Sequence, residues 1–328
     1  MTDDDYGGVT RTRMTTGVLA WTALVVVYLV WGSTYLAIRV GVRDLPPGIL
    51  AGVRYLLAGL LLFPIGITSG PAELRSIDRP TRNQWAGCAV VGVLLLVLGN
   101  GGVTLAERTV PSALAAVLVA TVPLWMVVFG VLLQRDQVSP LAGAGLLIGL
   151  AGVAVLAGGG PLSGHLLGVF VILGAAASWG LGSVLGHRLP LPQRALLGAA
   201  MQMLVAGVVL LVLAAIGGEF SRVHWTAVHP TSWWALAWLV MPGSIIGFTA
   251  YGYALSRLPR PTVATYAYVN PVVAVVLGTL LLHEAFTLRA AIGTALVVGS
   301  VALTIRGPRS VQQPETVNEW KVDHAERG

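Results

Sequence analysis

Residues 31–62 read WGSTYLAIRVGVRDLPPGILAGVRYLLAGLLL, and the landmarks of this stretch return 148 positions later in the chain. Trp31 falls on Trp179, and Gly59 falls on Gly207. The same offset, without a gap, aligns Gly32 with Gly180, Leu56 with Leu204, Ala58 with Ala206, Trp85 with Trp233, Gly99 with Gly247, Ala106 with Ala254, Pro111 with Pro259, Pro123 with Pro271, Gly130 with Gly278, Asp136 with Glu284 and Gly145 with Gly293. Tryptophans, prolines and an acidic position in one register indicate a duplicated unit.

The composition is that of an integral membrane protein. Of the 328 residues, 55% are hydrophobic and 10% are charged, and the mean hydropathy is +0.80, which leaves too little polar surface for a soluble globule. Stretches of about 17 to 25 apolar residues are long enough to span a bilayer as helices. Ten such stretches lie at about residues 17–38, 48–67, 85–105, 112–133, 140–157, 165–186, 195–216, 233–255, 262–282 and 287–305. The sequence therefore predicts an all-α membrane protein with ten transmembrane helices.

The duplicated unit contains an odd number of predicted spans, and this number fixes how the copies are threaded. Five spans end on the side opposite to where they began, so the second copy must cross the membrane upside down. We expect two inverted five-helix repeats at residues 17–157 and 165–306, flanked by tails at 1–16 and 307–328. The second tail is polar and mixed in charge, which is typical of disorder. Inverted repeats offer the geometry that alternating access requires.

The distribution of Lys and Arg predicts the orientation. With the N-terminus in the cytoplasm, fourteen of the twenty basic residues lie on the cytoplasmic side. The positive-inside bias therefore places both termini in the cytoplasm. The net charge of +6 is spread over several loops, which fits interaction with anionic lipid and does not indicate a nucleic-acid surface.

The residues that could carry cofactor or enzyme chemistry are sparse. Cys88 is the only cysteine and is expected to be a small buried residue inside a span. The six histidines lack metal-binding spacing, and the glycine runs 99–102 and 158–160 lack the lysine of a phosphate loop. Arg11 and Arg13 precede a long apolar run without a cleavage pattern, so we expect a retained first span. We predict no metal, no cofactor and no enzymatic activity.

Three runs of the sequence resemble a known family. WGSTYLAIRVGVRDLPPGILAGVRYLLAGLLL (31–62), ERTVPSALAAVLVATVPLWMVVFGVLL (107–133) and YAYVNPVVAVVLGTLLLHEAFTLRAAIGTALVVGSVAL (266–303) are similar to the repeated EamA module of the drug/metabolite transporter superfamily. The resemblance covers about residues 17–306. It implies a ten-helix secondary transporter of the inner membrane, in a family with many exporters of amino acids, related metabolites or drug-like compounds. Such modules often carry Glu after the fourth helix, where this chain has Asp136.

Arg54 is the ionisable residue that the sequence places well inside a span. A charged side chain there is costly unless it faces water or a partner. Arg54 is expected either to line the outer half of a cavity, where it would bind a carboxylate or hold Asn100, or to have a structural role as a helix anchor. The resemblance implies that Arg is a usual feature of this position. Its repeat mate is Gln202, which is uncharged, so an inward-facing pair would make the cavity electrostatically asymmetric.

Aromatic and amide residues at helical spacing supply the other candidate binding residues. Trp31 and Tyr35 share one helix face, as do Tyr266 and Asn270, and Pro271 removes a backbone donor beside the amide. A weaker candidate face contains Ser244, Phe248 and Tyr251. The alternatives are an interfacial aromatic belt and interhelical hydrogen bonding. The predicted substrate-binding set is Trp31, Tyr35, Arg54, Asn100, Gln202, Tyr251, Tyr266 and Asn270.

The carboxylates near the ends of spans are not expected to carry protons. Asp136 and Glu284 are predicted to be helix-terminus or ion-pair residues, and Glu107, beside Arg108, is expected to be solvated. Gly145 and Gly149 form a small-residue face that could pack internally or support a homodimer.

These features predict a secondary active transporter that moves a small amphipathic metabolite, amino acid or drug-like compound, in the export direction, by alternating access in the inner membrane. The alternatives are an exchanger of nucleotide sugars or other phosphate esters, a lipid-handling membrane protein and a passive channel. An exchanger of phosphate esters would be better served by several intramembrane cations than by Arg54 alone.

Overall fold

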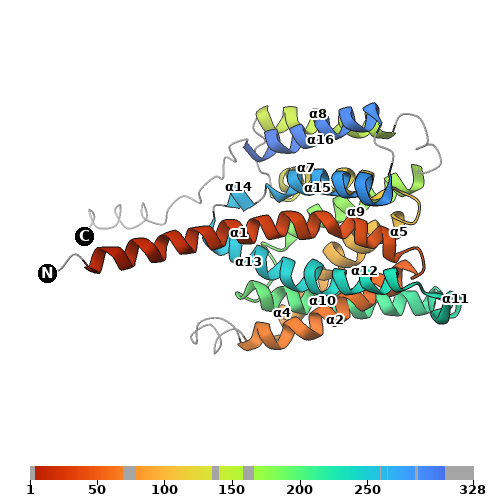
Figure 1. The fold of residues 1–328 in the computed structure, drawn as a ribbon, viewed down its shortest axis with the longest axis horizontal. Helices are drawn as coiled ribbons and strands as arrows, with labels where there is room; N and C mark the ends of the chain where they lie inside the picture. Colours follow the sequence, from red (N-terminus) through yellow and green to blue (C-terminus); the bar gives the residue numbers. More distant parts are fainter. Residues whose placement is uncertain are drawn as a thin grey trace, which may run out of the picture.

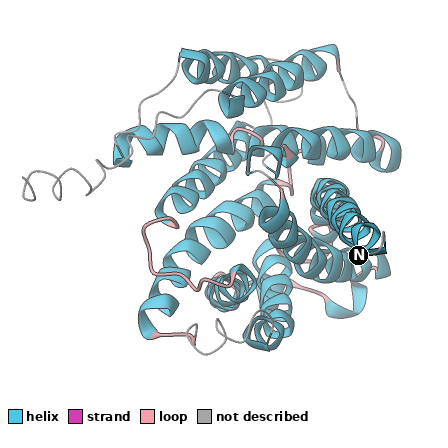
Figure 2. Cartoon of the chain, turned by 90° about the vertical axis from the view of Figure 1, so that its left-hand side faces the viewer, coloured by secondary structure: helices cyan, strands magenta, loops and turns pink. Residues whose placement is uncertain are grey.

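The computed structural model of the chain describes residues 4–68, 79–134, 140–157, 166–258, 260–263, 265–284 and 287–306. Within these ranges every regular element is a helix, and no strand occurs (Figure 2). The helices form one bundle, in which α1 begins and α16 ends at the same end while α11 lies at the other (Figure 1). The predicted all-α class is therefore confirmed.

The described part of the first repeat contains seven α-helices and one π-helical segment. Their bounds are α1 (Asp4–Gly41), α2 (Pro47–Thr68), α4 (Arg82–Gly92), the π-helical segment η1 (Val93–Asn100), α5 (Gly101–Ala106), α6 (Ser112–Val119), α7 (Val122–Gln134) and α8 (Pro140–Ala157). Proline stands at the first position of α2 and of α8, where its missing N–H costs no hydrogen bond. Thr81 and Gln84 form a reciprocal capping box at the start of α4.

The second repeat follows the same order. It comprises α9 (Leu166–Leu185), α10 (Ala195–Ile216), α11 (Glu219–Arg222), a single turn at Trp225–Ala227, α12 (Pro230–Val240), the π-helical segment η4 (Met241–Ile246), α13 (Gly247–Arg257), α14 (Arg260–Val263), α15 (Tyr266–Leu282) and α16 (Leu288–Arg306). The two π-helical segments begin at residues 93 and 241, which are repeat mates at the offset of 148.

Seven helical stretches in the described part of the chain are long and apolar enough to cross a membrane. They are Gly17–Gly41, Pro47–Thr68, Arg82–Ala106, Ser112–Leu133, Leu166–Leu185, Ala195–Ile216 and Pro230–Arg257. Three shorter apolar helices occupy Gly143–Val155, Val269–Leu282 and Leu288–Leu303. Large apolar side chains such as Leu167, Trp234 and Leu288 are exposed on the bundle, which is the arrangement expected of side chains that face lipid. The chain is a multi-pass membrane protein.

The helices α2 and α10 cross in close backbone contact. Gly52, Gly59 and Gly66 of α2 contact Leu211, Leu204 and Leu197 of α10, respectively. The residue numbers thus increase along one helix while they decrease along the other. The two helices therefore run antiparallel. They are also repeat mates, because Gly59 aligns with Gly207 and Leu56 with Leu204. Small residues allow the backbones of membrane helices to approach closely in this way.

Several close contacts between the repeats are reciprocal: each of them occurs twice, with the partners exchanged. Gly59 meets Leu204, and Gly207 meets Leu56. Three further reciprocal contacts follow the same rule: Gly32 with Val273 and Gly180 with Trp125, Gly99 with Trp179 and Gly247 with Trp31, and Gly149 with Ser300 and Gly152 with Val297. Reciprocal contacts of this kind are the mark of a two-fold relation between two equal units.

The outer pair α8 and α16 lies along one edge of the bundle in both views (Figures 1 and 2). Gly149 packs there against Ser300 of the same chain, so this part of the small-residue face packs internally. Cys88 is fully buried beside Leu197 and Met201, as predicted.

Candidate functional site

Arg54 projects from α2 into the interior of the bundle. Its side chain is 4% exposed. Its Nε donates a hydrogen bond to Ser244 Oγ (3.1 Å) and its Nη1 donates one to Asn100 Oδ1 (3.3 Å). The guanidinium also lies over the ring of Tyr55, 4.9 Å from the centroid. Arg54 thus joins α2 to both π-helical segments, and the hydrogen bonds provide the partners that a buried cation needs.

The π-helical segment η4 presents its polar groups to both Arg54 and Trp31. Ser244 receives the hydrogen bond from Arg54 and donates its own hydroxyl to the Leu239 carbonyl (2.9 Å). The carbonyl of the preceding residue, Gly243, accepts a hydrogen bond from Trp31 Nε1 (3.2 Å). π-Helical turns often occur at functional sites because they redirect main-chain and side-chain groups.

Trp31 lies at the centre of an aromatic cluster formed by three helices. Its ring centroid is 5.3 Å from that of Phe248, 5.1 Å from Tyr251 and 5.2 Å from Tyr266. Tyr251 and Tyr266 also contact each other edge to face, with centroids 5.7 Å apart. Aromatic pairs at these separations are favourable beyond the area that they bury. We call Trp31, Phe248, Tyr251 and Tyr266 the aromatic cluster.

Asn270 lies next to the aromatic cluster on α15 and is 7% exposed. With its amide nitrogen oriented toward the two nearest acceptors, it donates to the carbonyls of Tyr28 (3.3 Å) and Tyr266 (3.2 Å). Tyr28 and Thr265 form a further hydrogen bond between their hydroxyls. Asn270 therefore links α15 to α1 directly beside Gly32, where the two helices are in close contact.

Two of the predicted binding residues, Tyr35 and Gln202, have no ring contact with this cluster among the described residues. Tyr35 packs with Val103, Val110 and their neighbours in a separate apolar core, although it lies one helical turn from Trp31. Gln202 lies where α10 crosses α4, with its main chain against Gly92. No interaction found among the described residues joins the Gln202 side chain to Arg54.

Glu107 corrects the sequence-based expectation of a solvated carboxylate. Its side chain is 0% exposed, and both carboxyl oxygens lack a hydrogen-bond partner within the described part of the chain. The residue follows the span Arg82–Ala106 and forms the C-terminal cap of α5. Burial raises the pKa of the Glu107 carboxyl well above its usual range, repulsion from Glu284 raises it further, and Arg39 and Arg54 oppose these effects. The sequence contained one signal of this burial: the residue that aligns with Glu107 in the second repeat is the apolar Leu255.

Glu284 caps a helix, as the sequence predicted. Its Oε1 accepts hydrogen bonds from Ser112 N and Ser112 Oγ (both 2.9 Å), and its Oε2 accepts one from Ala113 N (3.1 Å), so the carboxylate closes the N-terminus of α6. Glu219 closes α2 in the same way through the main-chain nitrogens of Gly48 and Ile49. Asp136 lies outside the described residues.

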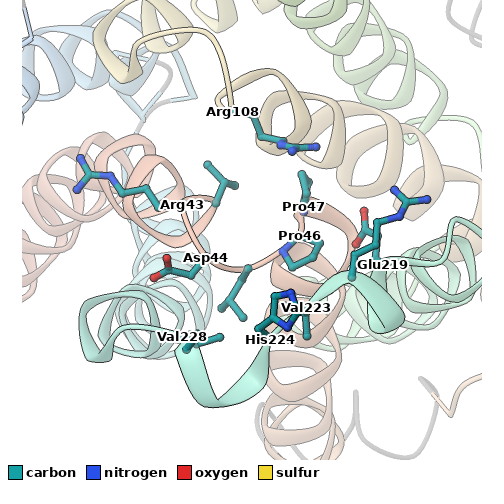
Figure 3. A pocket seen from close by; sticks show the side chains of 13 residues that line it. Arg43, Asp44, Pro46, Pro47, Arg108, Glu219, Val223, His224 and Val228 are labelled. Atoms are coloured by element: carbon teal, nitrogen blue, oxygen red, sulfur yellow. The ribbon is translucent and has the colours of Figure 1, made fainter.

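A surface pocket of about 340 Å³ lies at the end of the bundle where α11 is found (Figure 3). Its lining includes Arg43, Asp44, Arg108, Glu219 and His224. Arg43 extends away from the hollow, whereas Arg108 lies on its rim (Figure 3). None of the lining residues belongs to the aromatic cluster or touches Arg54, so this pocket is separate from the buried polar and aromatic groups.

Comparison with known proteins places these features in a family. The sequence profile described as the EamA-like transporter family matches residues 18–158 and again 166–306. The chain is 42% identical over 287 residues to the uncharacterised inner membrane transporter YedA of Escherichia coli strain K12, covering 87% of this chain and 90% of the relative.

More distant relatives also align over most of their length. The uncharacterised transporter YvbV of Bacillus subtilis strain 168 is 30% identical, with 86% of this chain and 90% of that protein covered. A probable terminal-alkyne amino-acid exporter of Streptantibioticus cattleyicolor is 29% identical, with 87% and 92% covered. One solved crystal structure, 23% identical, superimposes with a TM-score of 0.59 over 88% of this chain and 97% of the other, which shows a shared fold.

Proposed function

Because this chain belongs to the EamA-like transporter family, we propose that it is a secondary active transporter that exports small amphipathic metabolites by alternating access. In this proposal, residues 17–157 and 165–306 form two five-helix repeats, and the three shorter apolar helices complete a set of ten spans. The repeats are inverted, and the membrane is the inner membrane, as it is for the relative YedA. Both termini lie in the cytoplasm.

The observation that carries the proposal is the antiparallel crossing of the repeat mates α2 and α10, with the reciprocal contacts of Gly59 and Gly207. Mates that run in opposite directions belong to units of opposite orientation. Two such units can exchange conformations, so that a site between them opens alternately to each side of the membrane. The tightly packed glycines make the crossing a suitable pivot, because packed interfaces switch between discrete arrangements.

The proposed substrate carries an acidic group and an apolar part. Arg54 supplies a buried guanidinium whose present partners, Ser244 and Asn100, are neutral and can be exchanged for a carboxylate. The aromatic cluster supplies an apolar wall. It is connected to Arg54 through η4, because Gly243 accepts a hydrogen bond from Trp31 and Ser244 accepts one from Arg54. Asn270 contributes amide groups at the cluster's edge. Amino acids with apolar side chains have this chemistry, and one relative is named as an amino-acid exporter.

Counterflow in proteoliposomes tests the proposal. Vesicles loaded with unlabelled leucine or phenylalanine should accumulate the labelled amino acid transiently, and the initial rate should saturate. Arg54→Ala should abolish this accumulation, whereas Gln202→Ala, the same truncation at the repeat mate, should leave it nearly unchanged. Flux that rises linearly with concentration would indicate a channel, and counterflow of nucleotide sugars alone would indicate the phosphate-ester exchanger.

A further inference from the structure

Glu107 is a buried carboxyl group that the proposed binding site does not use. Both of its carboxyl oxygens are enclosed, and neither has a hydrogen-bond partner among the residues that the structure describes. Its neighbours along the chain, Val103, Ala106 and Val110, are all buried in one apolar core. A carboxylate that is transferred into such surroundings without a partner is very costly, and a protein normally avoids the cost by keeping the group protonated.

The cations near Glu107 are engaged elsewhere. The guanidinium of Arg39, on α1, donates to the main-chain carbonyl of Glu107 rather than to its carboxyl group. Arg54, on α2, donates to Ser244 and Asn100. Arg108 is exposed. The carboxyl group is therefore near positive charge without forming an ion pair, which is the condition under which it can take up or lose a proton when its surroundings change.

One of the remaining ionisable neighbours opposes ionisation of Glu107. Glu284, which follows α15, is an acceptor for three hydrogen bonds from the N-terminus of α6. A second carboxylate nearby makes ionisation of Glu107 still less favourable. Tyr35, on α1, is the other titratable group that interacts with it.

From this geometry we infer that Glu107 is the proton-binding site of the transporter, protonated when this end of the bundle is closed and ionised when water reaches it. The inference rests on the proposed function. Opening the contact between the α5–α6 turn and α1 would hydrate the carboxyl group. Its O–H bond would then break, the proton would pass to water and the carboxylate would remain. One proton would thus bind and leave during each cycle, without any redox step.

Infrared titration of the reconstituted protein tests the protonation directly and needs no substrate. The wild-type protein should show the carbonyl band of a protonated glutamic acid at pH 7, well above the usual glutamate pKa of about 4.3. Glu107→Gln should remove that band. Glu219→Gln should leave it, because Glu219 accepts hydrogen bonds from α2. A spectrum in which Glu107→Gln changes no protonated band at pH 7 would overturn the inference.

Transport by the same variants tests the coupling. In leucine- or phenylalanine-loaded vesicles, Glu107→Gln should retain counterflow within about two-fold, because glutamine imitates the neutral carboxyl group. Accumulation driven by a pH gradient should fall at least ten-fold in this variant. Equal loss of both activities in a folded protein would instead assign Glu107 to substrate binding, and retention of both would assign it to structure; either result overturns the inference. If the wild type moves neither amino acid, the proposed substrate class fails, while the infrared titration still decides the state of Glu107.

Discussion

The region around Arg54 and Trp31 can be compared with its repeat mate around Gln202 and Trp179. In both regions a tryptophan of the first helix of a repeat packs on a glycine at the end of a π-helical segment, Trp31 on Gly247 and Trp179 on Gly99. In both, the first helix also bonds to a carbonyl of that segment, through Trp31 Nε1 to Gly243 and through Ser178 Oγ to Leu94. The backbone arrangement is thus duplicated.

The chemistry is not duplicated. Arg54 has a neutral mate in Gln202, and Asn100 aligns with Phe248. Tyr251, Tyr266 and Asn270 align with Val103, Leu118 and Val122. The duplicated glycines maintain the packing in both halves, while these polar and aromatic groups occur at only one of the two equivalent sites. Mates with a packing role should therefore respond equally to mutation, and mates with a binding role should respond unequally.

The largest effect is expected at the α2–α10 crossing. A Cβ at Gly207 would lie 2.5 Å from the main-chain nitrogen of Leu56, and one at Gly59 would lie 2.8 Å from that of Leu204. Gly207→Ala and Gly59→Ala should each destabilise the protein by at least the ~1–3 kcal/mol typical of overpacking, because main-chain atoms must move. Thermal unfolding in detergent measures the effect. Gly174→Ala is the control, since nothing lies within 4 Å of a Cβ there; equal stability of all three variants would show that the crossing tolerates a methyl group.

The next effect separates Arg54 from Gln202. Arg54→Ala leaves the buried Ser244 and the partly buried Asn100 without their shared donor, which should cost about 1–3 kcal/mol in stability and abolish counterflow. Gln202→Ala should change neither quantity appreciably. Stability and counterflow are measured on the same preparations, so a loss of transport can be separated from a loss of folded protein. Equal losses of stability and counterflow in the two variants would contradict the expected difference between Arg54 and Gln202.

The next effect depends on pH and distinguishes Glu107 from its apolar mate Leu255. Because the pKa of Glu107 is raised in the folded protein, the folded state binds more protons than the unfolded state above the usual glutamate pKa. Its contribution to stability is therefore present at low pH and decreases by about 1.4 kcal/mol per pH unit as the pH rises from ~4.3 toward the folded-state pKa. Glu107→Gln should remove this decrease. Unfolding midpoints of wild type and variant that run parallel across this pH range would contradict the expectation.

The smallest effect concerns the indole of Trp31. Trp31→Phe keeps the aromatic contacts with Tyr251 and Tyr266 but removes the donor to the Gly243 carbonyl, which should cost about 0.5–1.5 kcal/mol. Trp179→Phe is the matched control at the repeat mate. Apparent affinity in counterflow should decrease several-fold for Trp31→Phe alone. An equal decrease for both variants would indicate that the tryptophans serve packing only.

Much of the architecture could be predicted because membrane helices carry strong local signals. Apolar length predicted the helices, and the constant offset predicted the repeats that the family profile also finds. The offset even pairs the reciprocal contacts, since Gly59 and Gly207 occupy equivalent positions. Glu284 was predicted to be a helix-terminus or ion-pair residue, but its role as the cap of α6 could not be predicted, because α6 lies far away in the sequence.

The environment of individual side chains was less predictable. Glu107 was expected in solvent because it follows a span and precedes Arg108, yet it is fully buried. Tyr35 and Trp31 share a helix face by spacing but pack into different clusters, because different helices lie against successive turns of α1. Whether a polar residue near a helix end meets water depends on the neighbouring helices, which local sequence does not specify.

The sequence by itself determined the class of the protein and the number of copies of its unit. These follow from hydropathy and periodicity, which can be read along the chain. Only the tertiary structure decided that Arg54 bonds Ser244 and Asn100, that the aromatic cluster forms around Trp31 and that Glu107 is enclosed without a partner. The physical reason is that solvation and hydrogen bonding of a side chain are set by atoms that lie far away in the sequence and meet only when the helices pack.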